Sequence, residues 1–143
     1  MSIIVRELRN RVGNRSMAIL EHHQQKILAY VYGTIDQLER HVGNACIVEM
    51  DFKNLLSWKS LAEFDDQDSR IVGLGGEDAS ARIIGRAYSV IELDNAKMLV
   101  DIYLRNGPEF IAAEISVSDG IQPSVGSGIE IEVTGLCFYP SNT

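Results

Sequence analysis

Carboxylate side chains gather between residues 65 and 80, and their chemistry would be the binding of a hard cation through oxygen. Counted from Asp66, Asp68 stands at the third position of a calcium-binding loop and Glu77 at the twelfth. The match fails at Arg70, which stands at the fifth position, where such a loop needs an oxygen ligand. Asp65, Asp66 and Asp68 are therefore candidate binding residues, but the sequence favours a solvated acidic loop and predicts no metal.

Motifs for catalysis or for a cofactor are the second kind of chemistry to consider. The Gly-Leu-Gly-Gly stretch at 73–76 lacks the spacing of a dinucleotide-binding loop, and acidic residues follow it where a phosphate loop has lysine. The histidines, His22, His23 and His41, do not have the spacing of a helical zinc-binding pair. The sequence therefore predicts no cofactor. It favours a non-catalytic role over an enzyme and leaves catalysis open.

Trp58, the single tryptophan, stands in the stretch 54–64, NLLSWKSLAEF. Leu55, Trp58, Leu61 and Ala62 recur at helical spacing, which predicts one amphipathic helix at about 54–64. We expect Trp58 to anchor this helix in the core. The alternative role for Trp58 is contact with a protein partner, or with a small molecule bound in a barrel mouth beside the 65–80 loop.

Aromatic and basic residues of the kind that bind single-stranded nucleic acid are also present. The formal net charge is −7, from 13 Lys and Arg against 20 Asp and Glu, and this total opposes a phosphate backbone. A nucleic-acid partner is therefore disfavoured, although residues 1–15 form a local basic arm. The candidates by residue type are Arg6, Arg9, Arg11 and Arg15 in the arm, and Tyr30, Tyr32, Arg82, Arg86, Tyr88, Tyr103 and Arg105 beyond it.

The elements that would position these side chains are mostly β-strands, and the clearest are two runs within 96–118. Their apolar residues recur with a period of two, which places alternate side chains on opposite faces of a sheet. The inward set is Met98, Val100, Ile102 and Leu104 in the first run and Ile111, Ala113, Ile115 and Val117 in the second. Asn106-Gly107-Pro108 between the runs is typical of a tight turn, so the pattern predicts an antiparallel hairpin.

Further β-prone runs cover 2–8, 16–21, 26–35, 45–52, 81–93 and 129–139, and the glycines inside two of them, Gly33 and Gly85, indicate sharp bends. The sequence predicts a single domain, residues 1–143, that is mostly β. The expected fold is an antiparallel small barrel or curved sheet with the one helix at 54–64. The second half of the chain has features of a small Greek-key barrel of the oligonucleotide-binding (OB) kind. A β-sandwich or an α+β fold is the alternative.

Composition and apolar runs indicate where in the cell the protein is expected. Hydrophobic residues make up 45% of the chain, as in an ordinary globular domain, and no apolar run is long enough for a signal peptide or a membrane span. The expected location is the cytoplasm, away from membranes. Cys46 and Cys137 lie in apolar runs, so we expect reduced, buried thiols, with a bridge between them as the alternative.

The sequence is compatible with three functions. The favoured function is a non-catalytic binding module that acts through a protein partner or by self-association, because a β domain offers strand edges for pairing. The first alternative is a small-molecule-binding barrel or an enzyme with its site near Trp58 and the 65–80 loop. The second alternative is a barrel that binds single-stranded nucleic acid.

Overall fold

The computed structural model describes residues 2–76, 78–94, 96–105, 109–117 and 121–140. Within these residues the chain forms eleven strands, one α-helix and one short 3-10 helix. They are β1 (Ser2–Val12), β2 (Arg15–His22), β3 (Gln25–Tyr32), α1 (Ile35–His41), β4 (Ala45–Asp51), β5 (Asn54–Leu61), η1 (Asp66–Asp68), β6 (Arg70–Gly75), β7 (Ser80–Leu93), β8 (Lys97–Leu104), β9 (Glu109–Ser116), β10 (Gly128–Thr134) and β11 (Cys137–Pro140). The prediction of a mostly β, antiparallel barrel or curved sheet is confirmed.

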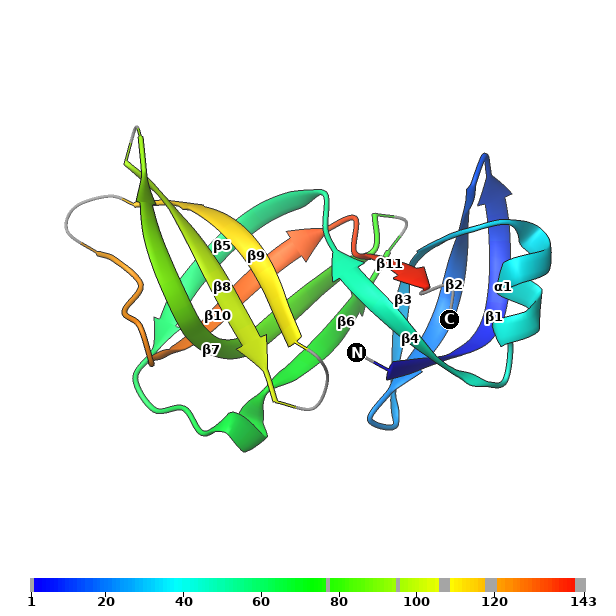
Figure 1. Cartoon of the computed structure of the whole chain (residues 1–143), viewed down its shortest axis with the longest axis horizontal. Helices are drawn as coiled ribbons and strands as arrows, with labels where there is room; N and C mark the ends of the chain where they lie inside the picture. The colour runs from blue at the N-terminus through cyan, green and yellow to red at the C-terminus, as the bar shows by residue number, and fades with distance from the viewer. Residues whose placement is uncertain (1, 77, 95, 106–108, 118–120, 141–143) are drawn as a thin grey trace.

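Five strands close a barrel in the order β1-β2-β3-β11-β4. Neighbouring strands are antiparallel except for β11 and β3, which are parallel. The helix α1 lies between β3 and β4 in the chain, beside β1 (Figure 1), and its Leu38 is fully buried in the core. Five strands with the last inserted between the third and fourth give the Greek-key arrangement of the OB barrel. This barrel uses the first third of the chain and the C-terminal strand, rather than the second half suggested by the sequence.

The segment between β4 and β11 forms a second, curled antiparallel sheet in the order β5-β10-β7-β8-β9, with β6 paired to β7 (Figure 1). The hairpin expected within 96–118 is confirmed as β8 and β9, which pair from Lys97 opposite Ser116 to Leu104 opposite Glu109. Its predicted inward residues from Met98 to Leu104 and from Ile111 to Ile115 are buried. The predicted turn at Asn106-Gly107-Pro108 lies outside the described residues.

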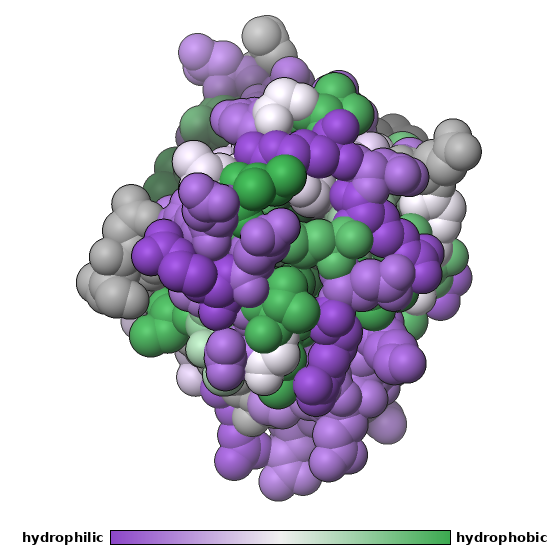
Figure 2. Space-filling model, turned by 90° about the vertical axis from the view of Figure 1, so that its right-hand side faces the viewer, coloured by the Kyte–Doolittle hydropathy of each residue, from purple (hydrophilic) through white to green (hydrophobic). Residues whose placement is uncertain are grey.

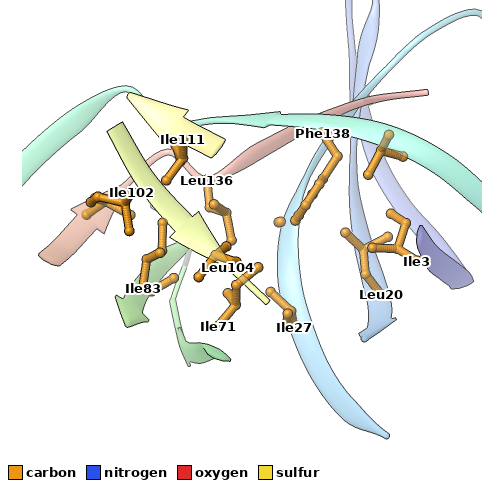
Figure 3. Packing of buried hydrophobic residues seen from close by; sticks show 14 of the residues in the cluster. Ile3, Leu20, Ile27, Ile71, Ile83, Ile102, Leu104, Ile111, Leu136 and Phe138 are labelled. Carbon is orange, nitrogen blue, oxygen red and sulfur yellow. The ribbon is translucent and has the colours of Figure 1, made fainter. Parts of the chain in front are cut away.

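One hydrophobic cluster runs from the barrel into the second sheet (Figure 3). Ile27 of β3 and Ile71 of β6 lie together where the two sheets meet, and Leu136 and Phe138 extend the cluster along the C-terminal strand. The two main chains approach closely at this place, because a Cβ added at Gly73 would lie 3.2 Å from the Cα of Ile27. The surface at the barrel end of the molecule is mainly polar, with apolar side chains in separate patches (Figure 2).

The prediction of a helix at 54–64 is wrong, because residues 54–61 form the strand β5, which pairs along its length with β10. A register shift between Glu132 and Val133 leaves Leu56 as the extra residue of a β-bulge. The bulge lets Leu55 and Trp58 both pack against the core although they are three residues apart. A bulged strand thus imitates the spacing of a helix.

The observed helix, α1, lies in a stretch whose polar sequence predicts a turn. Only Leu38 of its residues is buried, so there is no apolar stripe to reveal it. Its capping signals are nevertheless in the sequence. Thr34 accepts a hydrogen bond from the backbone N–H of Gln37 at 3.2 Å, and Arg40 and His41 occupy the last turn, where cations favour a helix.

Two other expectations can be compared with the structure. Gly85 lies inside β7, at a place where an added Cβ would lie 2.5 Å from the carbonyl oxygen of Tyr103. Gly33 lies between β3 and α1, so the prediction that it stands inside a strand is wrong. Cys46 and Cys137 are free and buried, as predicted. Among the described residues, no helix has the length and apolar character needed to cross a membrane.

Candidate functional site

Three adjoining hollows follow the outer face of the barrel along β2, β3 and β11. Their volumes are about 360, 390 and 270 Å³. The first two share Arg9 and Leu28, and the last two share Arg15 and Tyr30, so neighbouring hollows adjoin each other. We call this row of three hollows the barrel groove. Its lining residues are Arg9, Asn10, Val12, Arg15, Met17, Ile19, Lys26, Ile27, Leu28, Tyr30, Tyr32, Asp51, Phe52, Lys53, Gly73, Leu74, Gly75, Gly76, Gly135, Cys137 and Tyr139.

Strand alternation supplies the floor of the barrel groove. Along β2 the residues from Ser16 to His22 are alternately buried and half-buried, and β3 repeats the pattern from Ile27 onward. The buried set fills the barrel, and the other set, which includes Met17, Leu28 and Tyr30, faces the groove. The positions of these side chains therefore follow from the same pairing that builds the core.

The aromatic residues gather at one end of the groove. The rings of Tyr32 and Tyr139 are stacked, with centroids 4.8 Å apart and an interplanar angle of 14°. Beside them the guanidinium carbon of Arg15 lies 4.5 Å from the centre of the Tyr30 ring. This end of the groove thus presents flat π surfaces next to a cation, an arrangement on which a further planar group can stack.

The hydroxyl of Tyr139 accepts a hydrogen bond from its own strand. A hydrogen bond of 3.8 Å joins it to the Cys137 thiol. Loss of hydration first, and then this hydrogen bond, raise the pKa of Tyr139 to about 12. Burial likewise raises the pKa of the Cys137 thiol. Both groups are therefore neutral near pH 7, so this end of the groove carries no tyrosinate or thiolate charge.

Positive charge is concentrated in the barrel groove. Among the described residues that line it, four side chains are basic, Arg9, Arg15, Lys26 and Lys53, and one, Asp51, carries a carboxylate. Arg9 also pairs with Glu7 at 3.2 Å, and both partners are about half exposed, so the pair is weak and Arg9 stays available to a ligand. The groove therefore has the opposite sign to the chain as a whole.

The second sheet provides the other wall of the groove. Gly73, Leu74 and Gly75 at the end of β6, with Gly76 after it, face β2 and β3 across the first two hollows. Their lack of side chains, apart from Leu74, keeps the channel open where the two main chains approach. The glycine-rich stretch is thus a wall of the groove rather than a phosphate-binding loop before a helix.

The three candidate aspartates lie at η1, with Asp65 as its N-cap, and form hydrogen bonds or an ion pair with their own chain; none of them lines the barrel groove. Asp65 accepts a hydrogen bond from the N–H of Gln67 at 2.9 Å, and Asp68 accepts one from the N–H of Asp65 at 3.3 Å. Asp66 forms an ion pair of 2.7 Å with Arg86. Within the described part of the chain, no three His, Cys, Asp or Glu residues gather as a metal site.

Trp58 lies at a different place, where the edges of β5 and β9 face each other. Its indole N–H donates to the carbonyl oxygen of Ser116 at 3.2 Å. The ring lines a groove of about 640 Å³ that runs between the two edges, and we call it the seam groove. The seam groove adjoins the last hollow of the barrel groove, because Asp51, Phe52 and Lys53 line both. Its lining contains none of the three aspartates, so Trp58 and the 65–80 loop do not share one site.

The structure brings together some of the aromatic and basic residues that the sequence indicates as candidates for nucleic-acid binding. Arg9, Arg15, Tyr30 and Tyr32 line the barrel groove, whereas Arg82 pairs with Glu132 at 3.4 Å on the second sheet. Sequence reasoning missed Lys26, Lys53 and above all Tyr139. The alternation in the last strand, with Phe138 inward and Tyr139 outward, was the signal that could have found Tyr139.

Comparison with known proteins adds no family. No protein-family model, no curated protein and no solved structure matches this chain.

Proposed function

We propose that the barrel groove binds single-stranded nucleic acid. The observation that carries the proposal is the set of tyrosines beside guanidinium and ammonium groups along the three adjoining hollows, from Lys26 to Tyr139. Proteins that bind single strands combine these two features, because bases stack on aromatic rings while cations neutralise the phosphates. A duplex hides its base faces, so the stacked pair Tyr32–Tyr139 suits an unpaired strand.

The position of the groove on the barrel supports the same function. In OB barrels, oligonucleotides lie across the face made by the second and third strands. The barrel groove follows β2 and β3, and Tyr139 comes from the inserted strand β11 beside β3. Fold likeness alone does not establish a function, so the weight stays on the side chains that the groove contains.

The net charge of −7 is compatible with the proposal because charge acts locally. At physiological ionic strength, charges more than about 8 Å apart on an exposed surface are largely screened. In the described lining of the groove, a bound strand meets four cationic side chains and one carboxylate. The acidic surface elsewhere restricts binding to this channel.

The test is fluorescence anisotropy of labelled oligo(dT) and oligo(U) single strands, titrated with the protein at several salt concentrations. If all four cations contact phosphates, the logarithm of the binding constant falls with log salt with a slope of about −2.8, or roughly 50-fold from 50 to 200 mM. Binding that is absent at low salt, or that ignores salt, would refute the proposal. A duplex of the same length is the matched control and is expected to bind more weakly.

A further inference from the structure

The second sheet is an incomplete barrel whose two edge strands face each other across the seam groove. β5 pairs only with β10, and β9 pairs only with β8, so each has one edge without a neighbouring strand among the described residues. The sheet order places β5 and β9 in the same direction along the seam. The hydrogen bond from Trp58 to Ser116 links the two edges at one end. An open edge of this kind is a template for another strand.

The hydrogen-bonding groups of β9 that face the seam can be assigned. In a strand the N–H and C=O of one residue point to the same side, and successive residues alternate. The N–H of Val117 donates to Ala96, on the β8 side, at 2.8 Å, while the carbonyl of Ser116 accepts from Trp58 in the seam. It follows that Ala112, Glu114 and Ser116 turn their backbone groups toward the seam groove, and Ala112 and Glu114 also line it.

We propose that an extended peptide segment of a partner protein binds in the seam groove by adding a strand to the edge of β9. Backbone N–H and C=O groups that face the groove at every second residue match those of an added β-strand. Charge points the same way, because the lysines Lys53 and Lys97 are balanced by two carboxylates in the lining, Asp51 and Glu114. A neutral peptide main chain fits such a groove, whereas a phosphate chain does not.

The apolar lining indicates which peptides bind. Alternate side chains of an added strand would point to one face of the sheet and enter the groove. There they would meet Leu56, which is 56% exposed in the bulge of β5, and Leu99 on the outer face of β8. The indole of Trp58 closes the end. The partner segment is therefore one with apolar residues at every second position and little net charge.

The first test needs no partner. Amide hydrogen exchange, followed by NMR on the free protein, should be at least about tenfold faster at Glu114 and Ser116 than at their neighbours Ala113 and Ile115, because only the latter donate to β8. Uniform protection along β9 would show that its edge is already occupied and would overturn the proposal.

The second test is selection from a displayed library of random peptides on the whole chain, residues 1–143. Enriched peptides should carry apolar residues in alternation, should protect the amides of Glu114 and Ser116, and should bind Glu114→Pro at least about fivefold more weakly. Proline removes one seam-facing N–H and no bond to β8, so the fold should persist. The matched control, Glu114→Ala, removes the same carboxylate and keeps the N–H, so it should bind more tightly than Glu114→Pro, and the difference between the two variants measures the N–H alone.

Each outcome decides the proposal. No enriched peptide, or enriched peptides that bind Glu114→Pro and the wild type equally, would overturn it. If Glu114→Pro fails to fold, protection of the Glu114 and Ser116 amides by the peptide in the wild type decides instead. Sedimentation that shows a dimer, lost when Glu114 is replaced by proline, would identify the occupant as a second copy of the chain and would also overturn the proposal.

Discussion

Replacing Arg15 by glutamine isolates one cation of the barrel groove. Its guanidinium lies over the Tyr30 ring in the channel, so a strand that stacks nearby places a phosphate within its reach. One phosphate contact on a single strand contributes about 0.7 to the salt slope. Loss of that contact should weaken binding about eightfold at 50 mM salt and about threefold at 200 mM, with the slope falling by about 0.7.

The assay is anisotropy with labelled oligo(dT) across this salt range. Arg82→Gln is the matched control, because it removes the same charge from an arginine paired with Glu132 on the second sheet. Its affinity and slope should equal those of the wild type. The reasoning is refuted if Arg15→Gln keeps the wild-type slope, or if both variants lose affinity alike, since the second result would mean that only total charge matters.

Four more predictions concern stacking, titration and stability. Tyr139→Ala should weaken oligo(dT) binding by about 1–3 kcal/mol with an unchanged salt slope, whereas Tyr88→Ala, an exposed tyrosine on β7, should not. The pKa of Tyr139 is raised to about 12, so the absorbance titration at 295 nm of the wild type minus that of Tyr139→Phe should have its midpoint near pH 12, and a midpoint near 10 would contradict this. Because this pKa is higher in the folded protein than in the unfolded chain, the contribution of Tyr139 to stability is present below about pH 10 and is lost as the pH rises toward 12. Gly85→Ala should lower the free energy of unfolding by about 1–3 kcal/mol, measured by urea titration, because its methyl group would lie 2.5 Å from the Tyr103 carbonyl; no loss would contradict the close approach. Finally, we propose that residues 1–143 are one cooperative unit, since one core spans both sheets, so Trp58 fluorescence and circular dichroism should give coincident unfolding curves, and separate transitions would contradict this.

Sequence patterns were reliable where one face of a strand is buried along its whole length. The β8–β9 hairpin was predicted with its inward residues because Met98 to Leu104 alternate without interruption. The same reasoning failed at 54–64, because the bulge at Leu56 changes the period from two to three. A bulge depends on the partner strand β10, some seventy residues away, and single-sequence periodicity does not contain that information.

The barrel groove was harder to predict than the fold. Its aromatic end requires Tyr32 and Tyr139, which come together only because β11 pairs with β3 across most of the chain. The total charge hid the local excess of cations, since the groove gathers Arg9, Arg15, Lys26 and Lys53 from distant segments. In contrast, the clustered aspartates drew attention because they are adjacent in sequence, yet they cap η1 and bind Arg86.

The most direct test of the account is to map where a single strand binds. Titration of isotope-labelled protein with oligo(dT), followed by amide chemical shifts, should move the signals of β2, β3 and β11 around Tyr30, Tyr32 and Tyr139 and leave those of Trp58 and β9 unchanged. Saturable shifts confined to the barrel groove are the predicted result. Shifts elsewhere, or none at low salt, would contradict the proposed function.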